Sequence, residues 1–145
     1  PYHCHCLKTA RLIAEKIGLR DEEWKVSFQS RFGKAEWLKP YTTQVIKNLP
    51  RNGIRSLHVI CPGFVSDCLE TLEEIAMEAK DDFLSVGGVE FTYIPCLNDS
   101  ALGINMLSEI VIKGLAGWPS EPHAQEILDL KEKQKTLALK KGATN

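Results

Sequence analysis

The order of predicted helices and strands is the feature that most constrains the fold. Helical spacing of apolar residues predicts helices over residues 5–17, 42–49, 68–83 and 101–115, followed by a C-terminal helical tail over 121–145. Runs rich in β-branched and aromatic residues predict strands over residues 24–28, 56–61 and 89–94. Because a helix separates each strand from the next, the order favours a parallel sheet with right-handed crossovers. We therefore predict an α/β, Rossmann-like three-layer domain with a three-stranded parallel sheet.

Composition limits the classes of protein that fit this order. A chain of 145 residues with 43% hydrophobic content is long enough for a single domain over residues 1–145 with its own core. A net charge of −1 gives no overall basic field that would attract nucleic acid. The longest apolar runs are far shorter than the ~20 residues that cross a bilayer. Five cysteines, an odd number placed inside predicted elements, indicate reduced thiols in the cytoplasm and no structural disulfide.

Three loops follow the predicted strands, with the sequences QSRFG, CPGF and PCLND. In open α/β sheets the ligand binds beyond the carboxyl ends of the strands, so these loops are expected to border one site. In the first loop, Ser30 and Arg31 can donate hydrogen bonds, and Trp37 offers a flat apolar surface. This loop suits a planar aromatic ligand, although Trp37 covering the edge of the sheet fits the sequence equally well.

The segment FVSDCLETLEEIAMEAKDD gathers negative charge on a predicted helix that Asp67 can cap. Glu70, Glu74 and Glu78 share one face, and like charges four residues apart destabilise a helix unless something compensates them. The predicted opposite, buried face consists of Leu69, Leu72, Ile75, Ala76 and Ala79. The acidic face is either a solvated surface or a path for a cation such as Fe²⁺ or Mg²⁺. Crowding predicts a raised pKa for at least one of the carboxyls, as a proton acceptor near neutrality needs.

The HCHC run at residues 3–6 lacks the spacing of a zinc site, because ligands on consecutive helical positions point around the axis. We interpret it as the start of a half-buried helix. Cys61 and Cys96, near predicted strand ends, are expected to be small buried side chains.

Three segments, SFQSRFGKAEWLKPYT, CPGFVSDCLETLEEI and YIPCLNDS, resemble successive C-terminal motifs of the ferrochelatase family. Ferrochelatases insert ferrous iron into protoporphyrin to make haem. The resemblance runs over about four-fifths of the chain. It implies the C-terminal half of a two-domain bacterial enzyme, in which two similar halves enclose the porphyrin.

The resemblance also implies roles for particular residues. Glu70 matches the catalytic glutamate, and Glu70, Glu74 and Glu78 match a path for metal or protons along a helix with a π-type turn. The residues that match positions in or beside the porphyrin pocket are Ser30, Arg31, Trp37 and Phe64.

Further expectations follow from the same resemblance. Iron and porphyrin are substrates, no tightly bound cofactor is expected, and no cysteines follow Cys96 to hold the iron–sulfur cluster of some relatives. The family's histidine motif and N-terminal half are expected to precede Pro1, so this chain alone should show little turnover. The expected location is the cytoplasm, with peripheral association at the inner membrane left open.

Other functions remain open on the residues alone. A non-catalytic tetrapyrrole- or metal-binding module, or a chelatase for a different tetrapyrrole or metal, would carry the same features. A nucleotide-binding α/β domain fits less well, because the sequence contains neither a G-x-G-x-x-G nor a P-loop motif.

Overall fold

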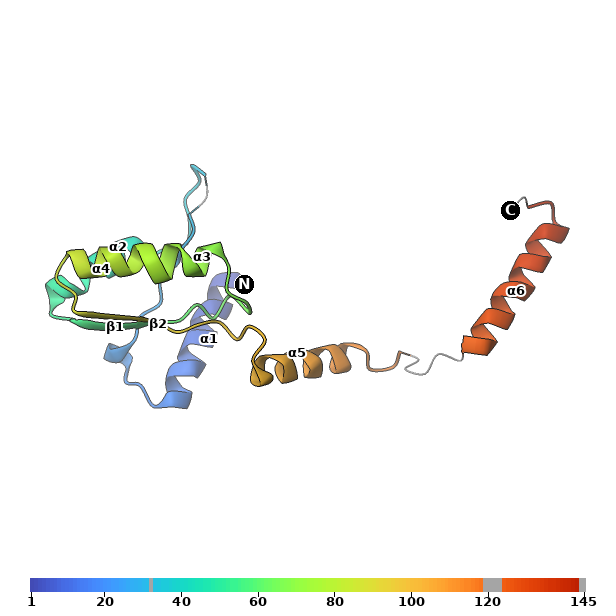
Figure 1. The fold of residues 1–145 in the computed structure, drawn as a ribbon, viewed down its shortest axis with the longest axis horizontal. Coiled ribbons are helices and arrows are strands. Elements are labelled where there is room, and N and C mark those ends of the chain that lie inside the picture. The colour runs from blue at the N-terminus through green and yellow to red at the C-terminus, as the bar shows by residue number, and fades with distance from the viewer. Residues whose placement is uncertain (32, 119–123, 144–145) are drawn as a thin grey trace. The chain divides into compact units, whose positions relative to one another are not determined.

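The computed structural model describes residues 1–31, 33–118 and 124–143. The chain divides into two compact units, residues 1–104 and 105–145, and each is described by itself. The first unit contains, in chain order, α1 (Tyr2–Ile17), the 3-10 turn η1 (Asp21–Glu23), α2 (Thr42–Asn48), the 3-10 turn η2 (Pro50–Asn52), β1 (Ser56–Val59), α3 (Leu69–Leu72), the π-helix η3 (Glu74–Ala79), α4 (Lys80–Ser85), β2 (Glu90–Tyr93) and the start of α5 (Ala101–Gly114) (Figure 1).

β1 and β2 pair in parallel, with Ser56 opposite Glu90 and Val59 opposite Tyr93. The strands predicted over 56–61 and 89–94 are thus confirmed, each slightly shorter than expected. The strand predicted over 24–28 is wrong: among the described residues this segment makes only an isolated parallel bridge between Phe28 and Tyr41. Alternating side chains predicted extended backbone there, but they could not supply a neighbouring strand for it. The described sheet therefore has two strands instead of three.

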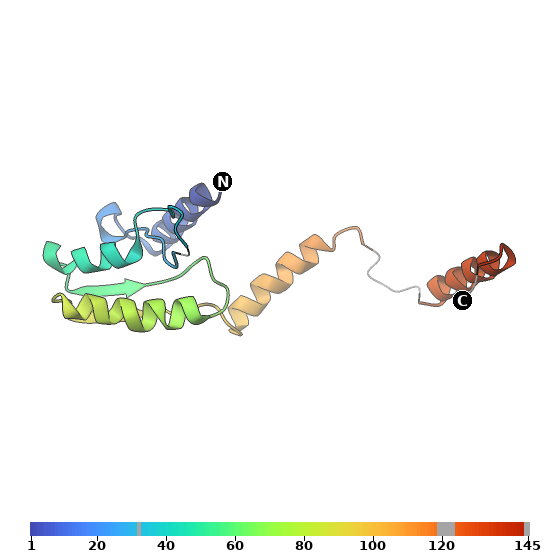
Figure 2. The ribbon, with the colours of Figure 1, turned by 90° about the horizontal axis from the view of Figure 1, so that it is seen from above.

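The core lies between this sheet and the helices on one of its faces. Ile46 of α2 packs with Ile75, Ala79 and Phe83, and Leu57 and Phe91 of the strands pack against this cluster. α2 and α4 lie above the strands in Figure 1, most of α1 lies below them, and Figure 2 shows the same elements from above. The result is a mixed helix and strand unit around a parallel pair of strands.

The predicted first helix is confirmed and begins at Tyr2. It ends at Gly18, whose φ of 77° is in the left-handed region that glycine adopts most readily. The Gly18 N–H donates to the Glu15 carbonyl, and the Leu19 N–H donates to the Ala14 carbonyl. These bonds pair carbonyls that the end of the helix would otherwise leave free.

The second unit holds the rest of α5 and the helix α6 (Ala124–Lys140). Residues 119–123 and 144–145, part of the predicted tail, lie outside the described residues. Ile110 and Ile112 of α5 are 59% and 68% exposed within the chain as it stands. Within the described part of the chain, no helix has the length and apolar character that crossing a bilayer requires.

Candidate functional site

The acidic segment contains a π-helical turn instead of running as one α-helix over 68–83. Its mark is the bond from the Glu78 N–H to the Glu73 carbonyl, five residues back, at 2.9 Å. In an α-helix, residues four apart are displaced around the axis by roughly 40° at each step, since each residue turns about 100°. A π-turn holds more residues, so it offsets this drift. Side chains four apart therefore stay on one face, as the family resemblance implied.

The buried face of the segment has this spacing of four. Thr71 and Phe83 are fully buried, and Ile75 and Ala79 between them are nearly so. The predicted buried positions Leu69 and Leu72 are wrong, because these side chains are 68% and 50% exposed. The 3.6-residue period used for that prediction does not hold across a π-turn.

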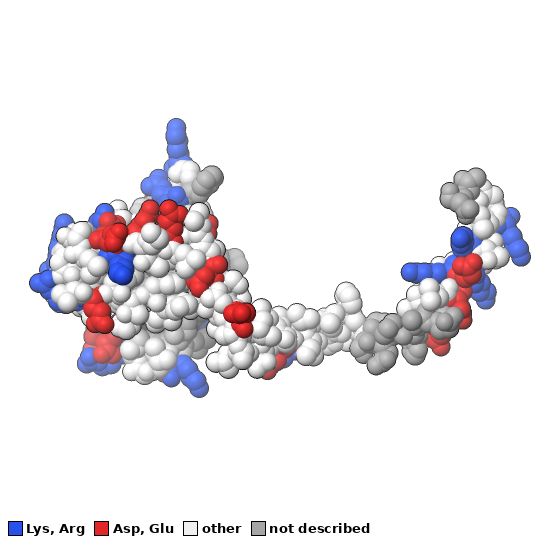
Figure 3. Space-filling view, viewed as in Figure 1, with Lys and Arg blue, Asp and Glu red and all other residues white. Residues whose placement is uncertain are grey.

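Four carboxylates occupy the positions just before the buried ones, and we call Glu70, Glu74, Glu78 and Asp82 the acidic row. Three of them, all except Glu70, line a groove of about 280 Å³. The opposite wall of the groove comes from residues 28–31 and 41–43. Figure 3 shows acidic side chains gathered over this helix, beside a projecting loop with basic side chains.

Ser30 joins the loop to the acidic row. Its hydroxyl donates to Glu74 Oε2 at 2.7 Å, and its backbone has a φ of 60°, unusual for a residue with a side chain. Next to it, Gln29 donates to the Glu70 carbonyl at 2.6 Å and accepts from the Cys61 thiol at 3.2 Å. These bonds link two of the three predicted loops, QSRFG after residue 28 and CPGF after β1. Gln29 was not anticipated as a site residue, because an isolated glutamine carries no sequence signal.

Basic side chains from other parts of the fold lie near the acidic row. Arg31 lines the groove, and its guanidinium lies 5.6 Å from the centre of the Tyr41 ring. Lys47 of α2 forms an ion pair with Asp82 at 3.1 Å. The compensation that the sequence required at the acidic face therefore comes partly from α2. The π-turn brings Asp82 to the same side of the segment as Glu74 and Glu78, where all three line the groove.

Glu70 and Glu74 are half-buried, whereas Glu78 is exposed. The pKa of Glu70 is lowered, first by a hydrogen bond from the Cys68 side chain and second by its own backbone N–H. The expectation of a raised pKa therefore fails at Glu70. In the described part of the chain, no three His, Cys, Asp or Glu side chains converge as a metal site would require. The acidic row is a series of separate carboxylates, not a closed cage.

The prediction that Asp67 caps this helix is wrong, because the N-cap residue is Cys68. The Asp67 carboxylate instead accepts hydrogen bonds from Asn98, Tyr93 and Thr71 at 2.7, 2.6 and 3.0 Å. These bonds, that from Asn98 first, hold the pKa of Asp67 well below its usual range. Burial, followed by the bond to Asp67, raises the pKa of Tyr93. The third predicted loop is thus linked to the second, and all three border one region.

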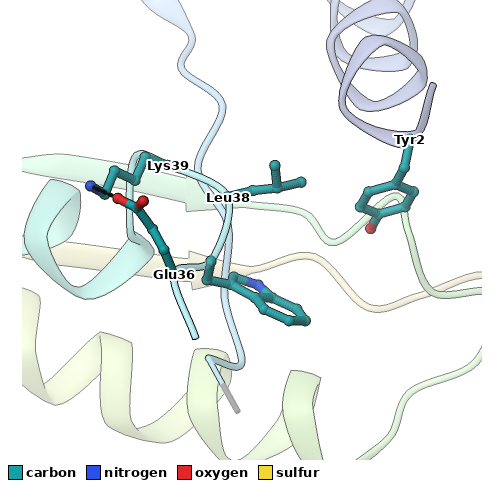
Figure 4. A pocket seen from close by; sticks show the side chains of 5 residues that line it. Tyr2, Glu36, Leu38 and Lys39 are labelled. Carbon is teal, nitrogen blue, oxygen red and sulfur yellow. Dashed lines mark hydrogen bonds and ion pairs between the residues drawn. The ribbon is translucent and has the colours of Figure 1, made fainter. Parts of the chain in front are cut away.

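An open pocket of about 480 Å³ lies beside Trp37, bordered also by Tyr2 and Leu38. Figure 4 shows the Leu38 side chain extending toward the Tyr2 ring at the start of α1. The Trp37 indole is 42% exposed and donates from Nε1 to the Gln29 carbonyl at 3.1 Å. Phe64 is half-buried and lines neither this pocket nor the groove. The structure therefore brings Ser30, Arg31 and three carboxylates of the acidic row to one groove, which neither Trp37 nor Phe64 lines.

The HCHC run starts α1, as predicted, and the His3 ring lies 5.6 Å from that of Phe28. All five cysteines are free. Cys61 and Cys96 are half-buried, less than expected, because both lie at the open ends of the strands.

Comparison with known proteins places these features in a family. The model of the ferrochelatase family matches residues 1–115. A protein named ferrochelatase from Polaromonas sp. (strain JS666) is 55% identical over 140 residues, which cover 96% of this chain and 38% of that protein. Ferrochelatases from Janthinobacterium sp. (strain Marseille) and Chromobacterium violaceum are each 58% identical, over 83% and 81% of this chain and 33% and 32% of their own lengths. The chain thus spans about a third of the length of the curated relatives it matches.

Proposed function

Because the chain belongs to the ferrochelatase family, we propose that it supplies the C-terminal half of an active site that inserts ferrous iron into protoporphyrin IX to form haem. The observation that carries this proposal is the joined pair Ser30 and Glu74, which sets a polar loop against the acidic row at one groove. The 280 Å³ groove has room for ions and water but not for a porphyrin. The macrocycle therefore lies outside it, against the loop.

The chemistry follows from the substrates. A free porphyrin must lose two pyrrole protons before iron can bind its four nitrogens. Glu70, the first carboxylate of the acidic row and half-buried, accepts protons or holds iron at the ring face. Its lowered pKa favours the ionised state, which attracts Fe²⁺, and therefore supports the metal-holding role over the role of proton acceptor.

Glu74 and Glu78 pass metal or protons to Glu70 along the π-turn. Separate carboxylates hold a divalent ion less firmly than a closed cage of thiolates or imidazoles, and this suits delivery of a substrate ion. Ser30 and Arg31 bind polar groups of the porphyrin, while Trp37 and Phe64 contact its flat face. The pocket beside Trp37 supports the aromatic contact.

The finer features of the fold are also part of the proposal. In the complete enzyme, β1 and β2 belong to a larger parallel sheet in a Rossmann-like three-layer domain, and an N-terminal half faces this one across the porphyrin. The chain spans 38% of its relative from Polaromonas, which leaves room for such a half. The enzyme uses no tightly bound cofactor or iron–sulfur cluster. It works in the cytoplasm, in keeping with its free cysteines. Binding of the complete protein to lipid vesicles tests for peripheral contact with the inner membrane.

Iron insertion by the complete protein tests the proposal. Glu70→Gln keeps the shape of the side chain and removes its charge, so the rate should fall by about 100-fold or more while porphyrin binding persists. A wild-type rate in this variant would refute the role of Glu70. Porphyrin binding without metal insertion by the wild type would instead identify a binding module. The 145-residue chain alone should show little turnover, since no counterpart of the family's histidine motif occurs in it.

A further inference from the structure

Asp67 and Asn98 form a reciprocal pair between two loops that are distant in sequence. The Asn98 side-chain oxygen accepts from the Asp67 N–H at 2.8 Å, and the Asn98 amide nitrogen donates to Asp67 Oδ2 at 2.7 Å. The Asn98 backbone N–H also donates to the Val65 carbonyl at 2.9 Å. Both hydrogen-bonding groups of the Asn98 side chain are therefore used to hold the loop that precedes α3.

The other carboxylate oxygen of Asp67 extends the link to two more elements. Asp67 Oδ1 accepts from the hydroxyl of Tyr93, the last residue of β2, and from the hydroxyl of Thr71, in the first turn of α3. Thr71 is fully buried and follows Glu70 directly. A shift of Thr71 would therefore turn Glu70 with it.

The backbone of Asn98 is specialised for this contact. Its φ of 49° is in the left-handed region, which asparagine tolerates better than most residues other than glycine. Glycine could adopt this conformation too, but it would lack the side chain that binds Asp67. Asparagine meets both needs at this position.

We propose that the Asp67–Asn98 pair is a positioning element for Glu70, which holds the first turn of α3 against the end of β2 and so sets the direction of the acidic row. The inference rests on the proposed function of that row. Asp67 and Asn98 act through Glu70 and are positioning residues. Misplacement of a reacting group by about 1 Å can cost on the order of 100-fold in rate, so even a small loss of order in this turn would be measurable.

An exchange of the two side chains in the complete enzyme tests the proposal. Asn98→Asp places two carboxylates next to each other. Asp67→Asn leaves one acceptor oxygen where the carboxylate has two, so either the Asn98 amide or the hydroxyls of Tyr93 and Thr71 lose their acceptor. The double exchange, Asp67→Asn with Asn98→Asp, restores a complementary pair and leaves an oxygen acceptor for Tyr93 and Thr71. The control is Asp99→Asn, a change of an exposed carboxylate in the same loop.

Each single variant should lower kcat for iron insertion by about 10- to 100-fold per folded molecule, with KM for porphyrin within about 3-fold of wild type. The double exchange should recover kcat to within about 5-fold, and the control should stay within about 2-fold. The folded fraction is measured by circular dichroism. A purely structural pair would lower the folded fraction and leave kcat per folded molecule unchanged. That result, or a double exchange no better than the worse single variant, overturns the proposal.

Amide hydrogen exchange over residues 69–72 separates this proposal from the proposed function. Both single variants should exchange faster there, and the double exchange should return toward wild type. If the wild type inserts no iron, the proposed function fails, while exchange still reports on the pair. Unchanged exchange in both single variants would then refute the pair as the element that holds this turn.

Discussion

The Ser30 hydroxyl donates a 2.7 Å hydrogen bond to Glu74 Oε2, although the two residues are 44 positions apart in the chain. This bond fixes the distance between the loop after residue 28 and the acidic row, and Ser30 adopts a left-handed backbone to make it. The bond from Gln29 to the Glu70 carbonyl holds the same loop against the helical segment one turn earlier.

Two substitutions of Ser30 should separate the contribution of its hydrogen bond to stability from the cost of its left-handed backbone. Ser30→Ala loses the bond to a carboxylate and keeps the unfavourable φ, so the free energy of unfolding should fall by about 1–2 kcal/mol. Ser30→Gly loses the same bond but relieves the backbone, so its loss should be smaller by up to about 1 kcal/mol. Urea denaturation of the complete protein measures both, and equal losses would contradict the backbone argument.

Position on the acidic row should decide how strongly a glutamate contributes to iron insertion. Glu74→Gln should lower kcat by about 10-fold, because the half-buried Glu74 lines the groove. Glu73→Gln changes an exposed neighbour that does not line it and should stay within about 2-fold. Steady-state rates with ferrous iron provide the comparison. Equal effects of the two substitutions would mean that total charge, not the row, matters.

The core should depend strongly on Phe83. This ring is fully buried between α2 and the strands, so Phe83→Ala should destabilise the protein by about 3–5 kcal/mol through lost burial and a cavity. The adjacent Leu84 is 37% exposed, and Leu84→Ala should cost clearly less. Chemical denaturation of both variants gives the difference, and similar losses would be inconsistent with the observed core.

The network at Asp67 predicts a dependence of stability on pH. Because folding lowers the pKa of Asp67, its contribution is fully present above the unfolded pKa of about 3.9 and is lost as pH falls below that value. Asp67→Asn should therefore flatten the fall in the free energy of unfolding below about pH 4. Denaturation midpoints between about pH 3 and 5 measure the slope, with Asp99→Asn as the control. A wild-type slope in the Asp67 variant would rule out this contribution.

Thiol reactivity should follow burial. Burial raises the pKa of Cys61 to about 12, so at pH 8 almost none of it is thiolate, the form that reacts. Cys4 is exposed. Brief treatment with iodoacetamide should therefore modify Cys4 well before Cys61, as measured by mass spectrometry of peptides. Faster modification of Cys61 would show that the end of β1 opens readily.

Local sequence patterns predicted most of the helices and strands but not how all of them pair in the sheet. The helices around Ala14 and Ile46 and the strands around Leu57 and Phe91 were predictable, because their periodicity or residue types report local backbone preference. The third strand was not, since Phe28 finds only the single bridge to Tyr41, and pairing depends on a partner distant in sequence.

The candidate site was also predictable in part. The acidic row could be found from the spacing of Glu70, Glu74 and Glu78. Its buried neighbours could not, because the π-turn replaces the period on which a helical pattern rests. The contacts of Gln29 and Asn98 could not be predicted either, since nothing local marks a hydrogen bond to a partner more than 30 residues away.

The wide turn at Glu74–Ala79 also limits how the length of this segment can vary. Deleting one residue there would restore a regular α-helix, and because the wide turn holds one residue more than an α-helical turn, the parts on either side would keep nearly the same faces. Thr71 and Phe83 would then be separated by roughly 20° around the axis, so both would stay in the interior. A second deletion, or an insertion, would rotate Phe83 away from the interior by roughly 100°. This stretch should therefore tolerate the loss of one residue better than any other change of length.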